Sequence, residues 1–310
     1  VNLINIIIIY NKYCLKMRKI GGILGGLGTY FMWQHYNEKE PGTFRGFSRA
    51  MGRIADAEIP IWAREPIFKT YSRFYNCNLD EVKSELQEFS SFSNFFRREL
   101  KEGTRPVCPE SPLVSPCDGK VLHVAKYMDS GFSVKGISFS IKSFLGIQTV
   151  PKTVYICTIY LSPGDYHRFH SPANWNIKSR THFSGYLLSV NPFLLKFIKN
   201  LFCLNERVIY MGDWTYGFFS MTPVGATNVG SIRVGIDPEL TTNQTAHKIG
   251  AVNKKDFEEI HSVVKGELFG EFNLGSTIVL LFEGPSNLEL CIHEGDTVKT
   301  GQPILHKNFC

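Results

Sequence analysis

The sequence predicts an α+β protein in which membrane-associated N-terminal helices precede a mostly antiparallel β sandwich or barrel. Two observations lead to this fold class. Helical periodicity dominates residues 44–105, whereas short apolar runs separated by glycine and Asx residues fill the chain from residue 106 onward. No strand–helix–strand alternation occurs among those runs, so a parallel doubly wound sheet is not expected. The chain therefore divides into residues 1–43, 44–105 and 106–310.

Residues 1–43 are predicted to hold a leader and a short transmembrane or anchor segment. The net charge of +6 is concentrated at this end, because residues 1–53 contain eight Lys/Arg and two Asp/Glu, a surplus of six. A basic leader on a balanced remainder favours targeting or an anionic membrane surface, and no nucleic-acid partner is expected. The apolar run 20–33 has 14 residues, fewer than the about 20 that a helix needs to cross a bilayer. A cleaved secretory signal is the alternative, but no small-residue cleavage site is evident.

Residues 44–105 are predicted to be a helical region at the membrane interface. Arg45, Arg49 and Arg53 recur at i, i+4 and i+8 beside an apolar stripe, which is the pattern of an amphipathic basic helix. Such a helix either lies flat on an anionic membrane or packs on its own domain, and this stretch alone favours neither. A further helix is expected to begin near Leu79, with Asp80 as its cap.

The region from residue 106 onward is predicted to be rich in strands, with turns at intervals typical of a sandwich or barrel. One further helix is expected at Pro192–Leu201, where proline occupies the first turn. The predicted strands are Lys120–Ala125, Thr153–Leu161, Val208–Met211, Phe218–Val224, Ser231–Ile236, Thr277–Phe282 and Leu288–Ile292. Eight cysteines without a CxxC pair indicate reduced thiols, and no metal site is predicted.

The stretch 272–277 contains a Gly–Ser peptide bond that we predict the protein cleaves in itself. Gly275 has no Cβ to crowd attack on its carbonyl, and the hydroxyl of Ser276 can reach that carbonyl through a five-membered ring. The attack exchanges the amide for an ester, and elimination followed by hydrolysis leaves a pyruvoyl group, whose ketone is an electron sink. Taken alone, the stretch is better explained as a turn before an apolar strand, and only the remaining motifs change that balance.

Two other stretches carry reactive groups. Asp118 belongs to an Asp-Gly dipeptide, which is often only a turn. His167 and His170 lie three apart in a loop bounded by glycine and proline, a spacing that suits two separate roles better than one metal; a zinc pair is the alternative and lacks a third ligand. An Asp, a His and a Ser can form a proton-transfer chain, although sequence does not show that Asp118, His170 and Ser276 meet.

Taken together, these motifs resemble the phosphatidylserine decarboxylase family, whose proenzymes make their own pyruvoyl group. The resemblance covers roughly residues 90–305, and its Leu-Gly-Ser-Thr form is similar to the bacterial and mitochondrial branch. The matching segments are Phe95–Leu100 through Arg105-Pro106, Ser115–Gly119, Asp165–Pro172, Val190–Pro192, Val224–Ile232, Lys265–Glu267 and Gly270–Thr277.

The resemblance assigns roles to four residues. Asp118, His170 and Ser276 match the self-cleavage triad, in which Asp118 would orient His170 and His170 would take the proton of Ser276. Cleavage between Gly275 and Ser276 would give a β subunit, 1–275, and an α subunit, 276–310, that together form a β-rich catalytic core. His167 matches the histidine of the decarboxylation step, as the acid that reprotonates the carbon.

The resemblance also implies an activity. The chain would be a carboxy-lyase that converts phosphatidylserine in a membrane to phosphatidylethanolamine through a Schiff base to the covalent pyruvoyl group at position 276. Tyr166, Gly225, Ala226 and Gly230 are candidate substrate-binding residues, although a Gly-rich turn explains the last three equally well. The implied location is the mitochondrial inner membrane, with the bulk of the chain in the intermembrane space; a homodimer is considered.

Two other functions remain open. One is a membrane-anchored β-sandwich binding or carrier module without self-processing. The other is a serine hydrolase that uses Asp118, His170 and Ser276 in an intact chain. The first predicts an intact inert chain and the second an intact active one, so the state of the 275/276 bond separates both from a pyruvoyl enzyme.

Overall fold

The structure is a computed structural model that describes residues 43–128, 140–190, 200–226, 231–273, 276–285 and 287–306. The chain comprises two compact units, residues 1–46 and 47–310, and the fold below is that of the second. The predicted anchor lies outside the described residues except for its last residue, as do Gly230, Gly275 and nearly all of the predicted helix Pro192–Leu201. Among the described residues, no helix combines the length and apolar character needed to cross a membrane.

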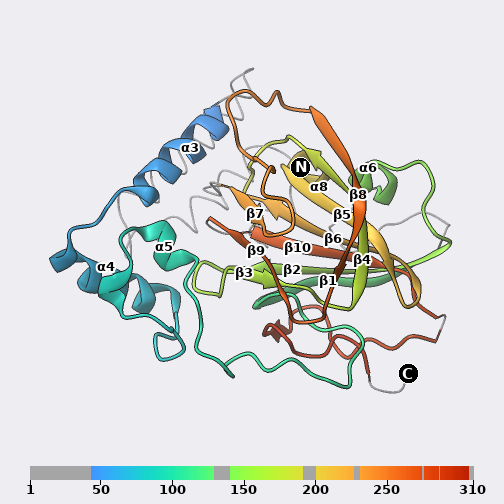
Figure 1. The fold of residues 1–310 in the computed structure, drawn as a ribbon, viewed down its shortest axis with the longest axis horizontal. Coiled ribbons are helices and arrows are strands. Elements are labelled where there is room, and N and C mark those ends of the chain that lie inside the picture. The colour runs from blue at the N-terminus through green and yellow to red at the C-terminus, as the bar shows by residue number, and fades with distance from the viewer. Residues whose placement is uncertain are drawn as a thin grey trace, which may run out of the picture. The chain divides into compact units, whose positions relative to one another are not determined.

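The first described part of the chain is helical, as predicted (Figure 1). It contains α3 (Thr43–Asp56), α4 (Ile61–Tyr75), the 3-10 turn η1 (Leu86–Glu88) and α5 (Phe92–Phe96). The amphipathic helix expected around Arg45 and Arg53 is confirmed by α3. The helix expected near Leu79 is wrong. The Asp80 amide donates to Asn78 Oδ1 at 3.1 Å, so the side chain of Asn78 closes a turn there in place of a helix.

The rest of the unit is a mostly antiparallel β structure, which confirms the predicted α+β class (Figure 1). The large sheet has eight strands in the order β11-β1-β2-β10-β6-β5-β4-β8, and the small sheet has three in the order β3-β9-β7. The strands are β1 (Gly119–Met128), β2 (Thr153–Leu161), β3 (Arg168–His170), β4 (Trp175–Phe183), β5 (Arg207–Trp214), β6 (Gly217–Gly225), β7 (Ile232–Val234), β8 (Val252–Val263), β9 (Leu268–Phe272), β10 (Ser276–Phe282) and β11 (Thr297–Val298). Two short helices, α6 (Ile141–Leu145) and α8 (Leu201–Leu204), accompany the sheets.

Strand β10 lies at the centre of the large sheet and is buried on both faces. Ile278 and Leu280 belong to a core cluster that also contains apolar side chains of the small sheet. Val279 and Leu281 point to the opposite face, where they belong to a second cluster with side chains of α6 and α8. Because successive side chains of a strand alternate between faces, a strand covered on both sides is apolar on both, as this one is from Ile278 to Phe282.

The strands missed from the sequence are polar or short. β8 is an edge strand whose residues are mostly exposed, so it has no apolar run to reveal it. The small-sheet strands β3 and β9 have three and five residues. The strand predicted at Leu288–Ile292 is wrong, because only Leu290 pairs there, in an isolated bridge to Leu305.

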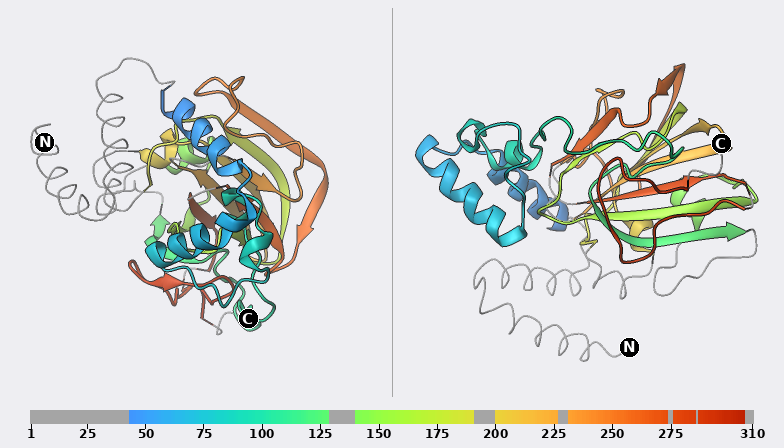
Figure 2. Two further views of the ribbon diagram at one scale, coloured as in Figure 1. Left: turned by 90° about the vertical axis from the view of Figure 1, so that its left-hand side faces the viewer. Right: turned by 90° about the horizontal axis from the view of Figure 1, so that it is seen from below.

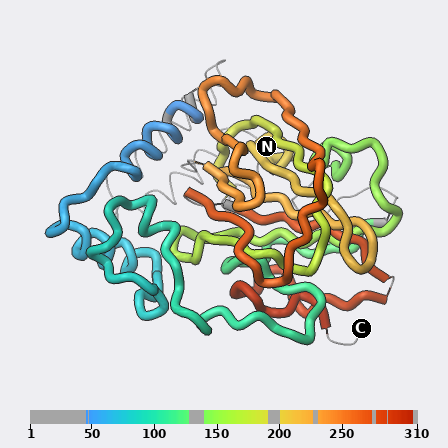
Figure 3. The backbone as a smooth tube through the Cα atoms, in the orientation of Figure 1, coloured from blue at the N-terminus to red at the C-terminus, as the bar shows by residue number. Residues whose placement is uncertain are grey.

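The helical segment and the small sheet meet at one end of the unit. The ring centroids of Phe96 in α5 and His167, next to β3, are 3.9 Å apart, and Arg97 bonds Glu271 of β9 at 2.9 Å. Figure 2 shows α4 and α5 beside this end of the sheets, and the tube in Figure 3 follows the chain between them. The predicted reactive loop therefore lies where helices and sheets join.

Candidate active site

The residues on the two sides of the predicted cleavage junction contact the two ends of one short loop. Leu161, the last residue of β2, is the register partner of Ser276, the first residue of β10. Six residues later, the carbonyl of His167 accepts the amide of Phe272 at 3.0 Å. Phe272 and Ser276 are separated by four residues, at most about 14 Å of extended chain. The loop 162–167 and the segment 273–275 therefore both run between the Leu161–Ser276 pair and the His167–Phe272 pair. His167 accordingly lies near the junction.

His170 is held as a neutral base by its neighbours. Its Nδ1 lies 2.9 Å from the carbonyl oxygen of Gly266, and its Nε2 lies 3.1 Å from the hydroxyl of Tyr166. Because a carbonyl only accepts, Nδ1 must donate, and Nε2 carries the lone pair that accepts from Tyr166. Burial lowers the pKa of His170, and the Gly266 carbonyl partly opposes that shift. This tautomer is the one that a base acting through Nε2 requires.

Asp118 is a buried carboxylate just before β1. Its oxygens accept from Arg105 Nε at 2.8 Å and Nη2 at 2.7 Å, from Lys299 Nζ at 3.1 Å and from the amide of Thr300 at 2.9 Å. Burial alone would raise the pKa of Asp118, but the hydrogen bonds and charge of Arg105 hold it below the ordinary value. Asp118 is therefore ionised and far from a simple turn residue.

Asp118 was expected to orient His170, but within the part of the chain that the structure describes the Asp118 carboxylate accepts no hydrogen bond from His170. Arg105 and Lys299 occupy the carboxylate, and the carbonyl of Gly266 takes the place beside Nδ1 that Asp118 was expected to fill. The two groups remain close, since the backbone amide of His170 donates to the carbonyl of Pro116 at 2.7 Å. The negative charge of Asp118 raises the pKa of His170 through space.

His167 is fully buried and has one unsatisfied ring nitrogen. Its Nδ1 donates to the carbonyl of Asp165 at 2.8 Å. Its Nε2 has no hydrogen-bond partner among the described residues. Burial lowers the pKa of His167 from 6.5 to about 3, so the ring is neutral at physiological pH and Nε2 exposes a lone pair. A buried acceptor without a hydrogen-bond partner costs about 1–3 kcal/mol, and a ligand that donates a hydrogen bond to Nε2 would remove this cost.

The four candidate substrate-binding residues are placed differently. Tyr166 is buried, its hydroxyl is on His170, and burial raises its pKa to about 12. Gly225 is the register partner of Ser276 in β6, but its amide donates to the carbonyl of Glu206 at 2.8 Å. The amide of Gly225 is therefore already used within the fold. Ala226 is buried, and Gly230 lies outside the described residues.

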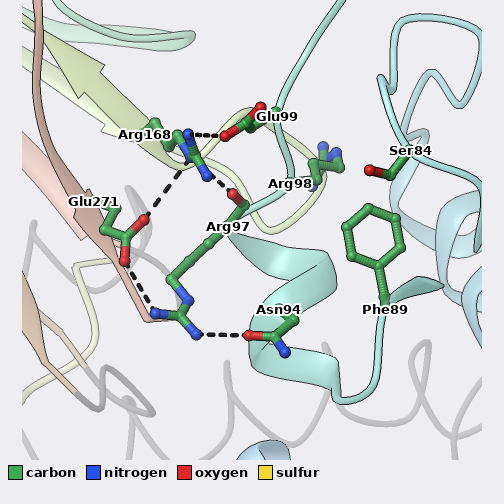
Figure 4. A pocket seen from close by; sticks show the side chains of 8 residues that line it. All are labelled: Ser84, Phe89, Asn94, Arg97, Arg98, Glu99, Arg168 and Glu271. Carbon is green, nitrogen blue, oxygen red and sulfur yellow. Dashed lines mark hydrogen bonds and ion pairs between the residues drawn. The ribbon is translucent and has the colours of Figure 1, made fainter.

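A pocket of about 360 Å³ opens beside the loop 162–167 (Figure 4). Its lining residues are Ser84, Phe89, Asn94, Arg97, Arg98, Glu99, Arg168 and Glu271. Two of its arginines are neutralised, since Arg97 bonds Glu271 at 2.9 Å and Arg168 bonds Glu99 at 3.0 Å. Arg98 lies apart from that network, on the side of Ser84 (Figure 4).

Arg98 is a buried cation without an anionic partner in the described chain. Arg98 is 3% exposed, and its Nε and Nη1 have no hydrogen-bond partner among the described residues. Nη2 donates to the carbonyls of Gly164 at 2.7 Å and Asp165 at 3.1 Å. The Asp165 carbonyl therefore bridges Arg98 and His167. Buried charges are normally paired, and Arg98 is one of the residues that line the pocket, so its two nitrogens without partners indicate an anion site.

Sequence reasoning missed the roles of Arg98, Arg105 and Gly266. All three lie in segments that carried the family resemblance, but each contacts the site through a fold that sequence does not show. Gly266 has φ +86°, and a Cβ there would lie 2.6 Å from Val107, so only glycine presents this carbonyl to His170 without strain. Isolated glycine in a Lys-Gly-Glu turn was the available signal.

Comparison with known proteins identifies the family. Residues 92–306 match the family model described as phosphatidylserine decarboxylase. The chain is 45% identical over 268 residues to the mitochondrial phosphatidylserine decarboxylase proenzyme of Caenorhabditis elegans and 42% identical over 290 residues to that of Rattus norvegicus; each match covers 84% of this chain and 71% of the relative. It is 34% identical over 354 residues to the mitochondrial proenzyme 1 of Saccharomyces cerevisiae, covering 83% of this chain and 71% of that relative.

The matched range holds every motif on which the resemblance was based from residue 95 onward, and it includes the small sheet, β10 and the buried histidines. Both the family model and the relatives cover well over half of the chain. The chain therefore belongs to the phosphatidylserine decarboxylase family.

Proposed function

We propose that this chain cleaves itself between Gly275 and Ser276 and then decarboxylates phosphatidylserine to phosphatidylethanolamine at a pyruvoyl group formed from Ser276. The observation that carries the proposal is the unsatisfied Nε2 of His167, on a loop whose two ends pair with the two sides of the junction. The relatives' names, which give the substrate and call them proenzymes, support it.

The first step needs a base for the hydroxyl of Ser276. His170 is that base in our proposal, because its Nδ1–H is fixed by Gly266 and its Nε2 lone pair is turned to a hydroxyl. The hydroxyl of Tyr166 holds that lone pair in the structure, so it either yields to Ser276 or passes the proton along. Asp118 acts through its charge, which favours the imidazolium that forms when His170 takes the proton.

The two fragments are expected to stay together after cleavage. The α subunit contributes β10, which pairs with β2 on one side and β6 on the other, and β11, which pairs with β1. Ile278 and Phe282 are fully buried, so release would expose the apolar centre of the sheet at about 25 cal/mol per Å².

The decarboxylation step needs a group that holds and returns one proton. The pyruvoyl ketone supplies an electron sink for the pair that carbon dioxide leaves behind. His167 is neutral, so its Nε2 can accept a proton from the substrate's ammonium group as the amine becomes a nucleophile. The same nitrogen then returns that proton to the carbon that lost CO2. The Asp165 carbonyl keeps Nδ1 protonated throughout and so reserves Nε2 for this transfer.

Arg98 is proposed to bind the phosphodiester of the substrate in the adjacent pocket. A cation on the carboxylate would stabilise the charge that must disappear in the transition state, which slows the reaction. The phosphodiester persists from substrate to product, so binding it costs no activation energy. Arg98 and His167 both donate to the Asp165 carbonyl, so the proposed anchor lies beside the loop that carries the proposed proton-transfer group.

Replacing Arg98 by Gln is expected to raise KM for phosphatidylserine about 10- to 100-fold, the value of one or two charge-assisted hydrogen bonds. Arg98→Lys should recover part of the loss. Lys83→Gln, which removes an exposed cation paired with Glu99, is the matched control and should leave KM unchanged. Phosphatidylethanolamine, which lacks the carboxylate, should inhibit the Arg98→Gln variant more weakly by the same factor. Unchanged inhibition would show that Arg98 does not hold the phosphodiester.

Helix α4 is proposed to contact the membrane that holds the substrate. Ile61, Trp62 and Phe74 are 65%, 83% and 54% exposed, and several large apolar side chains exposed on one helix suit a lipid surface. Trp62→Ser should reduce co-sedimentation with anionic vesicles several-fold, whereas Val264→Ser, which removes an exposed apolar side chain off this helix, should not. Equal binding of both variants would exclude α4 as the contact.

We propose the mitochondrial inner membrane as this surface, in keeping with the mitochondrial relatives.

The reaction itself distinguishes the proposal from its rivals. Purified protein incubated with phosphatidylserine vesicles should release CO2 and form phosphatidylethanolamine in equal amounts. Release of free serine or fatty acid from the lipid would instead favour a serine hydrolase. Binding of vesicles without turnover would favour a carrier or binding module.

A further inference from the structure

Three side chains that can ligate a metal meet at a site that the reaction does not use. His182 lies in β4, Glu206 immediately precedes β5, and His247 lies in the stretch between β7 and β8. One ligand atom from each can be chosen so that all three lie within 4.8 Å of one another. No short motif links them, since His182 and Glu206 alone are 24 residues apart, and the sequence analysis did not consider them.

Glu206 differs from the other buried carboxylates of the described chain. There are three of these, and Asp118 and Asp237 each pair with an arginine and a lysine. Glu206 is 1% exposed, and its only ion-pair partner among the described residues is His182, at 2.9 Å. Its Oε1 also accepts the amide of Asn243 at 2.9 Å, while its Oε2 has no hydrogen-bond partner there. Buried carboxylates are normally paired with a cation, and Glu206 has neither an arginine nor a lysine partner among the described residues and keeps one oxygen unused.

The donor set fits one class of cation. Two imidazoles and a carboxylate suit Zn²⁺ and related transition metals, whereas Mg²⁺ and Ca²⁺ prefer oxygen ligands alone. The rings of His182 and His247 lie 5.4 Å apart at 65° to each other, so they are not stacked and can both direct a nitrogen to a common point. Tetrahedral zinc forms bonds of about 2.0–2.1 Å, so binding would draw the three ligand atoms around one point, and His247 is the one of the three residues that is only half-buried.

We propose that His182, Glu206 and His247 bind a divalent transition-metal ion, Zn²⁺ foremost, with a structural role. The ion would tie the stretch between β7 and β8 to the end of β4 and the start of β5. The backbone connects this site to the cleavage junction, because the carbonyl of Glu206 accepts the amide of Gly225, the register partner of Ser276. The ion would therefore support the strand next to position 276 without touching substrate.

The test uses the full-length protein purified without chelator. We expect elemental analysis to find close to one zinc per chain, and we expect a strong chelator to lower Tm, with Zn²⁺ but not Mg²⁺ restoring it. Ligand binding to the folded state stabilises it by RT ln(1 + [L]/Kd), so the shift should grow with zinc concentration. Glu206→Gln and His247→Ala should each lose the metal. His123→Ala, which disrupts a pair between the buried His123 and the exposed Glu294, is the control and should keep it.

A chain that carries far less than one transition metal, and whose Tm responds to neither chelator nor Zn²⁺, would overturn the proposal. That result would make the cluster an imidazolium–carboxylate pair. These wild-type measurements decide the question even if the Glu206 and His247 variants fail to fold. Retention of the metal by both variants would also overturn it.

Discussion

Ser276→Ala is expected to leave one uncleaved chain of full length that forms no phosphatidylethanolamine. The alanine has no hydroxyl to attack the Gly275 carbonyl, and no ketone can form at position 276 afterwards. Both losses follow from one oxygen atom, so cleavage and activity should disappear together, activity to the level of a protein-free blank. A denaturing gel and a CO2-release assay on the same preparation measure them.

The matched control is Ser220→Ala, which removes a buried serine hydroxyl of the same sheet that has no hydrogen-bond partner among the described residues. It should cleave and turn over like the unmodified chain, because a buried hydroxyl without a partner adds nothing to stability. A Ser276→Ala chain that is still cut after residue 275, or that still decarboxylates, would refute the assignment.

His167→Asn is expected to retain self-cleavage but to lose decarboxylation by about 10²- to 10⁴-fold, the usual contribution of one positioned acid–base group. The asparagine amide can still donate to the Asp165 carbonyl as Nδ1 does, so the loop keeps its anchor. What the variant lacks is the Nε2 lone pair. Rapid formation of the two fragments, with turnover near background, is the result that this role of His167 requires.

His170→Asn is the reciprocal variant. It keeps a donor for the Gly266 carbonyl and loses the Nε2 that faces Tyr166, so it should remain uncleaved. Any residual decarboxylation should come only from the fraction of chains that are cleaved. If His167→Asn and His170→Asn lose both steps to the same extent, the division of labour between the two histidines is wrong.

The sequence predicted the layout of this protein well where side-chain pattern decides it. The run 278–282 is apolar at every position because β10 is covered on both faces, and the strand was predicted almost to its ends. β8 was missed because an edge strand with exposed residues has no such pattern. The turn at Asn78 was mistaken for a helix start because an Asx residue can close either structure.

The site was predictable in its parts but not in its connections. Asp118, His167 and His170 were selected from the sequence as reactive groups, and the first two are buried, yet the hydrogen bonds of all three depend on contacts across the fold. The Gly266 carbonyl contacts His170 from 96 residues away in the sequence. Arg105 and Lys299 contact Asp118 from 13 and 181 residues away. The free donors of Arg98 appear only once α5 is packed beside the loop 162–167.

The mass of the purified, unmodified protein under denaturing conditions tests the central claim most directly. Our account predicts two species, one of them the 35 residues from 276 to 310, lighter by one ammonia than the same peptide with an N-terminal serine. Its N-terminus should resist sequencing and react with phenylhydrazine, and the two species should run as one complex before denaturation. A single intact chain that decarboxylates phosphatidylserine would contradict the account.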